Sequence, residues 1–248
     1  MKLVTVGDVM VDVVTDELPA SGERAHGSVR LRAGGSAVNA ALAAREFGAE
    51  AQLVGRIGND AAGALVLAAL DAHGVDARLA RDGELATGTA VALRDAVVAD
   101  RGANARLSPD DLPDPLAGDA LLVSGFALFQ QGSSDAARAA LERFEGEWTA
   151  VDLASPRLAR SDFDARVVFA TKEEARAVPR LRARFEIVCL KDDYGVVRTS
   201  PFGAGDTFAA AFLVAVATGA DVDEALQRAR EAAARAATCT ASAAGESP

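Results

Sequence analysis

The sequence predicts an α/β protein: a doubly wound, mostly parallel sheet flanked by helices, with a small β lid. Three observations support this prediction. Short apolar, β-branched runs alternate with helical segments along most of the chain, which is the pattern of parallel sheets. Polar residues and glycines follow these runs, at the strand ends where open parallel sheets bind ligands. Extended polar segments at about 18–32 and 76–100 interrupt the alternation, and we expect them to form the lid.

The composition indicates one globular domain spanning residues 1–248. Hydrophobic residues make up 50% of the chain and charged residues 25%, which is not the composition of a disordered chain. The net charge of −10 argues against a nucleic-acid or anionic-membrane partner. The N-terminal apolar run is interrupted by Asp8 and Asp12, unlike a signal peptide or membrane span. Together with two cysteines that lack metal-ligand spacing, this predicts a cytoplasmic protein.

The first segments place polar residues at a strand end. A buried strand is predicted from Lys2 to Val9, and Asp12 follows it, placed either to meet a ligand or to be a solvated carboxylate. Gly34 and Gly35 precede an Ala-rich helix, so a small ligand can approach bare backbone there. Asn39 lies one turn inside that helix, where its amide can both donate and accept hydrogen bonds.

The middle of the chain contains the predicted lid. A strand from Gln52 to Ile57 precedes a helix that Asp60 can cap. After it, segments 76–80 and 89–100 alternate weakly, as hairpin strands do, and with 28–32 they would form a small sheet. Such a sheet is too small to bury a face alone and leaves unpaired edges. We therefore expect a homodimer that forms through the lid.

The second half resumes the alternation. Strands are predicted at 120–124, 148–153, 166–170 and 185–190, with helices at 134–145 and 222–237. The turn of Gly203, Ala204 and Gly205 then leads through Asp206 into an apolar helix. Glycines let several amide groups point at one spot, and the helix adds its positive end. Either this is an anion hole with a carboxylate at its lip, suited to phosphoryl transfer to a hydroxyl, or it is an ordinary helix start.

Taken together, these segments resemble the ribokinase, or PfkB, family of carbohydrate kinases. The resemblance covers most of the chain in the family's order. The segments that carry it are GGSAVNAALAAREFG at 34–48, GRIGND at 55–60, TGTA at 87–90, GAN at 102–104 and GAGDTF at 203–208. The glycine pair near the start and the GAGD turn near the end are more specific together than either is alone.

The resemblance implies phosphoryl transfer from ATP, with Mg²⁺, to a sugar hydroxyl. Asp206 would be the base, and the amides of Gly203, Ala204 and Gly205 would stabilise the charge on the transferred group. Glu174 would lie in the outer shell of Mg²⁺. By their positions in the family's order, Asp12, Gly34, Gly35 and Asn39 are assigned to the sugar, and Lys191, Gly195, Gly203 and Gly205 to the nucleotide.

The nucleotide half departs from the family pattern. Thr171 stands where the metal-associated motif begins with Asn, and Lys191 ends a strand where the family has Gly. Ser200 and Pro201 replace an Asp-Thr pair, which puts a monovalent-cation site in doubt. The segment before Gly203 is too short for the strands that other members place there.

The sugar half narrows the substrate class. Met10 and Phe126 stand where ribokinase itself has polar ligands, and Thr87-Gly88-Thr89 lacks the arginine with which related phosphofructokinases grip a phosphate. This favours an unphosphorylated sugar, sugar acid or sugar amine. The lid arginines would either pair with a substrate carboxylate or form a solvated face; they are Arg30, Arg32 and Arg94.

Two other functions compete with a sugar kinase. A degenerate family member would bind a sugar and dimerise without transferring phosphate. The shortened nucleotide half favours this alternative. A dinucleotide-binding oxidoreductase is disfavoured because no G-x-G-x-x-G turn follows the first strand. The intact Asp206 and its glycine turn favour an active kinase.

Overall fold

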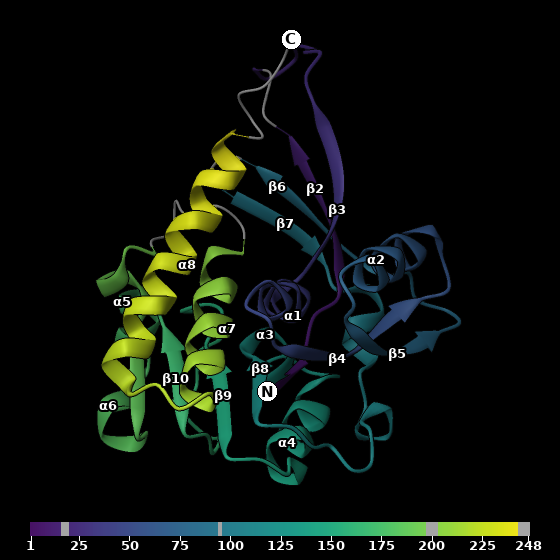
Figure 1. Cartoon of the computed structure of the whole chain (residues 1–248). Helices are drawn as coiled ribbons and strands as arrows, with labels where there is room; N and C mark the ends of the chain where they lie inside the picture. The colour runs from purple at the N-terminus through teal and green to yellow at the C-terminus, as the bar shows by residue number, and fades with distance from the viewer. Residues whose placement is uncertain (16–19, 94–95, 197–202, 243–248) are drawn as a thin grey trace.

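The fold is built on two sheets, seen in a computed structural model that describes residues 1–15, 20–93, 96–196 and 203–242 (Figure 1). The larger sheet has seven strands in the order β11-β10-β9-β8-β1-β4-β5, and every pairing in it is parallel. Its strands are β1 (Lys2–Val6), β4 (Glu50–Gly58), β5 (Asp76–Asp82), β8 (Ala120–Ser124), β9 (Trp148–Asp152), β10 (Val167–Ala170) and β11 (Ile187–Leu190). The predicted doubly wound parallel sheet is confirmed.

Helices bury both faces of this sheet because its strands are apolar on both sides. Leu3 of β1 packs into one core with α1, α2, α7 and α8, whereas Val4 and Val6 pack into a second core with α4. The helices are α1 (Ser36–Glu46), α2 (Ala61–Ala72), α3 (Gly125–Leu128), α4 (Ser134–Arg143), α5 (Lys172–Ala177), α6 (Leu181–Arg184), α7 (Ala204–Ala217) and α8 (Val222–Ser242), with 3-10 turns η1 (Gly102–Arg106), η2 (Pro109–Asp111) and η3 (Lys191–Tyr194). None of the helices, as far as the chain is described, is both long and apolar enough to cross a bilayer.

The smaller sheet is the lid, with the strand order β3-β2-β6-β7. Its strands are β2 (Met10–Thr15), β3 (Val29–Gly34), β6 (Gly88–Leu93) and β7 (Ala96–Asp100). Registers place Asp12, Ala90 and Ala99 in one row, and these residues line a cavity. The opposite face carries the next row along, Val13, Leu31, Val91 and Val98.

Two sequence-based expectations about the lid need correction. Segment 76–82 is not part of it, because β5 pairs in parallel with β4 at the edge of the main sheet. Its weak alternation is that of an edge strand with one solvated side. The first predicted strand, 2–9, is also divided: β1 ends at Val6, and β2 begins at Met10 in the lid sheet. Asp12 therefore lies within a lid strand and not in a loop beyond β1.

Candidate active site

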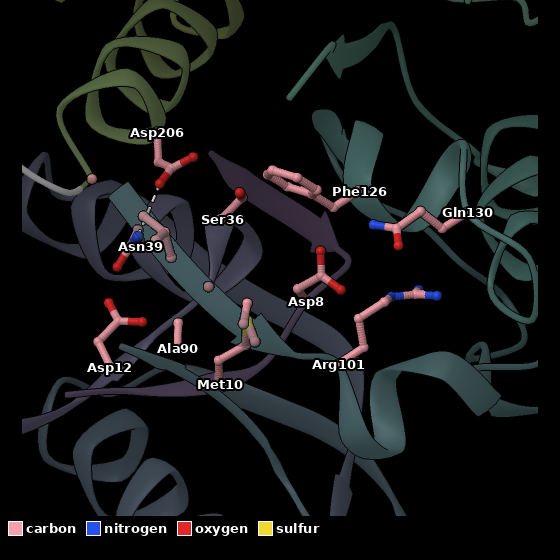
Figure 2. Close-up of a pocket in the computed structure, with 14 residues that line it drawn as sticks. Asp8, Met10, Asp12, Ser36, Asn39, Ala90, Arg101, Phe126, Gln130 and Asp206 are labelled. Carbon is pink, nitrogen blue, oxygen red and sulfur yellow. Dashed lines mark hydrogen bonds between the residues drawn. The ribbon is translucent and has the colours of Figure 1, made fainter. Parts of the chain in front are cut away.

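A cavity of about 360 Å³ lies beneath the lid, where β2 leaves β1 and where α1 and α7 begin (Figure 2). Its polar side chains come from five parts of the chain that the fold brings together. The lining residues are Asp8, Met10, Asp12, Gly35, Ser36, Asn39, Ala90, Val97, Ala99, Arg101, Phe126, Gln130, Gly203 and Asp206. Of the predicted sugar and catalytic residues, Asp12, Gly35, Asn39, Gly203 and Asp206 thus share one cavity.

Asp206 lies in the first turn of α7 and faces Asn39 of α1. The Nδ2 of Asn39 donates a hydrogen bond to Oδ2 of Asp206 at 2.9 Å (Figure 2). Burial, with a contribution from the charge of Asp152, raises the pKa of Asp206 to about 7, against the opposing effects of Asn39 and Lys191. At neutral pH the carboxyl group therefore exchanges its proton readily, which is what a general base requires.

The turn before α7 is formed by Gly203 in a left-handed conformation, with φ 87°. This conformation favours glycine. A Cβ on Gly203 would also lie 3.4 Å from Cγ of Asn39. The turn therefore brings the first amides of a 14-residue helix close to Asn39 and the cavity, and such amides have no partner within their own helix.

Asp12 is held on the cavity face of β2. Its Oδ2 lies 3.4 Å from Nη2 of Arg32, its neighbour across the strand pair. Burial raises the pKa of Asp12, and the positive charge of Arg32 opposes the rise. Gly34, predicted to contact the sugar, is not among the cavity-lining residues. Instead it makes room for Asp12, because a Cβ at Gly34 would lie 2.2 Å from Oδ2 of that carboxylate.

Gly34→Ala is therefore expected to displace the Asp12 carboxylate and, with Asp12 in the sugar-binding role that the family resemblance implies, to weaken sugar binding. Loss of hydrogen bonds to a charged group predicts a KM for the sugar that is about 10- to 100-fold higher, with kcat reduced much less. Gly83→Ala is the control, since no atom lies within 4 Å of a Cβ added there. Steady-state kinetics on both variants check this. An unchanged KM in Gly34→Ala would contradict the placement of Asp12 at the sugar.

The structure adds cavity residues that the sequence did not single out: Asp8, Ser36, Arg101 and Gln130. Burial raises the pKa of Asp8 to about 6, while Arg101 and the Ser124 hydroxyl oppose the rise. Arg101 donates to the carbonyl of Gln131 at 3.0 Å and to Oγ of Ser133 at 2.5 Å. Its buried Nε has no partner among the residues described. Asp8 could have been found from its position after β1, whereas Arg101 carries no such local signal.

Of the predicted nucleotide and metal residues, Gly203 lines the cavity, whereas Lys191, Gly195, Gly205 and Glu174 do not. Glu174 is buried in a capping box with Thr171, whose N–H donates to Oε2 of Glu174 at 2.7 Å. Lys191 opens η3, and its Nζ lies 2.8 and 2.9 Å from the two carboxylate oxygens of Asp152. Gly195 is the exposed left-handed residue that ends η3.

A divalent metal ion would find few free ligands here. Within the described ranges, no group of three or more His, Cys, Asp or Glu side chains is arranged to hold a metal. Both oxygens of Asp152 contact Lys191, and one oxygen of Glu174 accepts the Thr171 N–H. Given the residues that are described, a Mg²⁺ ion would therefore fit with phosphate and water as its direct ligands and Glu174 outside them. The Ser200-Pro201 pair, which in the sequence puts a monovalent-cation site in doubt, lies outside the described residues.

Solved structures share this fold. Adenosine kinase from Sinorhizobium meliloti is 21% identical, with a TM-score of 0.77 over 98% of this chain and 99% of that one. Fructokinase from Vibrio cholerae O395, in its fructose-, ADP- and potassium-bound form, is 21% identical, with a TM-score of 0.76 over 96% and 92%. A protein described as ribokinase II from E. coli, in complex with ATP and Mg²⁺, is 18% identical, with a TM-score of 0.77 over 96% and 92%.

Sequence comparison establishes the family. No curated protein sequence matches the chain. The sequence profile described as pfkB family carbohydrate kinase matches residues 1–179 and 196–248. That match includes both glycine segments and all the described residues that line the cavity. The chain therefore belongs to the pfkB family of carbohydrate kinases.

Proposed function

We propose that the chain is a kinase that transfers the γ-phosphoryl group of ATP to a hydroxyl of an unphosphorylated sugar, sugar acid or sugar amine. The observation that carries this proposal is the position of Asp206, in the cavity and beside the Gly203 turn, with a pKa of about 7. In this mechanism Asp206 accepts the proton of the attacking hydroxyl, while the hydrogen bond from Asn39 orients the carboxylate.

The transferred group would be held at the start of α7. The N–H groups of Gly203, Ala204 and Gly205 and the positive end of the helix suit the charge on a phosphoryl group. Removing such a preorganised contact typically costs about 3 kcal/mol in the transition state. When bound with ATP, Mg²⁺ would neutralise phosphate charge, and Glu174 would orient its water shell.

The charges in the cavity favour a substrate without a phosphate. Among the described residues that line the cavity, three are carboxylates, Asp8, Asp12 and Asp206, and one is an arginine, Arg101. A phosphosugar would be repelled by this balance, whereas hydroxyls and amines can donate to the carboxylates. A sugar acid would place its carboxylate at Arg101. Of the predicted lid arginines, Arg30 is exposed, Arg32 pairs with Asp12, and Arg94 lies outside the described residues.

An ATP-consumption screen tests the function. Neutral aldoses and ketoses, sugar acids, amino sugars, nucleosides and phosphosugars would each be offered with ATP and Mg²⁺. We expect ADP formation with a member of the unphosphorylated classes. Turnover of phosphosugars alone would contradict the substrate class.

A family member that binds sugar without phosphoryl transfer is the second candidate, favoured by the short segment between Gly195 and Gly203 in the nucleotide half. Calorimetry separates the two functions. Heat of sugar binding without ADP formation from any substrate would support this candidate and contradict the kinase.

The lid is proposed to form a homodimer through its outer face. That face exposes Val29 (66%), Leu31 (58%), Val91 (37%) and Val98 (64%) to solvent, and apolar patches of this kind mark interaction sites. We expect a dimer by light scattering at micromolar concentration. A double change, Leu31→Lys with Val98→Lys, should shift the equilibrium towards monomer by more than about 100-fold, because two buried charges would oppose association.

Val222→Lys is the control for the dimer, since this valine is exposed at the start of α8 and is not part of the lid sheet. It should leave the mass unchanged. A monomeric native protein at micromolar concentration, or a dimer that survives both lid substitutions, would contradict assembly through this face.

A further inference from the structure

Lys191 is a buried lysine beside the proposed phosphate site. The exposed fraction of its side chain is 9%, compared with 48% for Lys172. Burying an ammonium group costs free energy of desolvation, so buried lysines usually have a charged partner or a function. The partner is Asp152 at the end of β9, which contacts Nζ with both oxygens. What this ion pair does is not explained by the catalytic role of Asp206.

The ammonium group remains charged in this position. Burial alone would lower the pKa of Lys191, but the carboxylates of Asp152, Glu174 and Asp206 outweigh burial and raise it. The structure therefore keeps a full positive charge on the nucleotide side of the site, within electrostatic range of the catalytic carboxylate.

The same ammonium lies against the start of α7. A Cβ placed on Gly205 would be 3.3 Å from Nζ of Lys191 and 3.6 Å from its Cδ. Gly205 is in the first turn of that helix, where unpaired N–H groups and the helix dipole create positive potential. A cation next to a helix N-terminus is unfavourable by itself. An anion bound by both the amides and the ammonium would turn this repulsion into attraction.

We propose that Lys191 is a phosphate-binding residue, whose ammonium group contacts a polyphosphate held at the Gly203–Gly205 turn. The inference rests on the proposed function only for the location of the phosphate. Asp152 holds the ammonium in place before the ligand arrives. The chain thereby supplies part of the positive charge that a metal ion brings, so polyphosphate binding has a component that needs no metal.

A purely structural ion pair is the competing explanation. In that case Lys191 would only tie the end of β9 to η3. Removing it would then change stability but not phosphate affinity. Anion binding in the absence of metal is therefore the property that separates the two explanations.

The test is a calorimetric titration with inorganic tripolyphosphate in EDTA, without sugar. Lys191→Met is expected to weaken binding by about 10- to 100-fold, the usual effect of losing a charged hydrogen bond. Lys2→Met is the matched control, since Lys2 lies at the amino end of β1, and it should bind within about twofold of the native chain. An unchanged affinity in folded Lys191→Met, or a native chain that binds no tripolyphosphate, would overturn the proposal.

A second pair of variants covers the case in which Lys191→Met does not fold. Asp152→Asn and the double variant Asp152→Asn with Lys191→Met both lack the Asp152 carboxylate, so they differ only in the ammonium group. Lys191→Met alone leaves the buried Asp152 carboxylate without its partner, which is destabilising. The double variant removes that carboxylate as well. We expect it to bind tripolyphosphate at least 10-fold more weakly than Asp152→Asn. Equal affinities would overturn the proposal.

These titrations also separate the inference from the proposed function, because they need no turnover. If a sugar is phosphorylated but Lys191→Met leaves tripolyphosphate affinity unchanged, the inference alone is wrong. If Lys191→Met weakens binding but no sugar supports ADP formation, the proposed kinase activity alone is wrong.

Discussion

Asp206→Asn is expected to lower kcat by at least 10²–10⁴-fold, the usual contribution of a general base. Sugar affinity should change little, because the amide has nearly the shape of the carboxylate and Asp206 acts on the proton in the transition state. Native kcat should rise with pH through about 7, as the carboxyl group of Asp206 loses its proton. Steady-state kinetics, with sugar affinity measured by calorimetry, check both. A variant within a few fold of native turnover would show that another group is the base.

The same substitution is expected to stabilise the fold at high pH. The pKa of Asp206 is about 7 in the folded chain, against an ordinary value of 3.8. Its contribution to stability is therefore fully present below pH ~4 and lost as pH rises through ~7. The neutral amide avoids this loss, so Asp206→Asn should be more stable than native by roughly 1–3 kcal/mol at pH 8, with little difference near pH 4.

Urea unfolding at both pH values measures this gain. Asp71→Asn, a change at an exposed carboxylate on α2, should show no comparable pH-dependent difference. A loss of activity together with a gain of stability is the pattern expected when a residue that destabilises the fold, here a buried carboxylate, is retained for function. A variant that loses stability at pH 8 would contradict the buried, proton-exchanging state of Asp206.

The main sheet could be predicted because each of its central strands shows its character in its own short stretch of sequence. Runs such as those of β1 and β8 are apolar on both faces, which is typical of strands that are covered by helices on both sides. The edge strand β5 could not be assigned in this way. Its alternating charged and apolar residues fit a lid hairpin as well as a sheet edge, and only its pairing with β4 distinguishes the two.

The candidate site shows the same limit. Asp206 and its glycine turn are neighbours in sequence, so their chemistry can be read from one segment. The contact between Asn39 and Asp206 joins residues 167 positions apart, and it was predicted only in the sense that the family resemblance put both in one site. Lys191 was visible as a departure from the family pattern, but the sequence does not show that its partner is Asp152.

Gly35→Ala is expected to be the most destabilising single methyl addition in the site. Gly35 precedes α1 with φ 94° and ψ 146°, a region that is almost restricted to glycine. An added Cβ would also lie 2.3 Å from the carbonyl oxygen of Asp8. Because that atom is backbone, the connection between β1 and β2 or the first turn of α1 has to move. We expect a loss of about 4 kcal/mol or more in the free energy of unfolding.

Gly219→Ala separates the clash from the backbone strain. Gly219 has a similar φ of 97°, but a Cβ there would meet no atom within 4 Å. It should cost only about 1–2 kcal/mol, the price of the left-handed conformation. Urea denaturation of both variants gives the difference. Equal losses would mean that the contact with Asp8 is easily relieved. A much larger loss for Gly35→Ala would show that the backbone of Asp8 and the start of α1, which carries Asn39, pack closely and cannot separate to accommodate a side chain at Gly35.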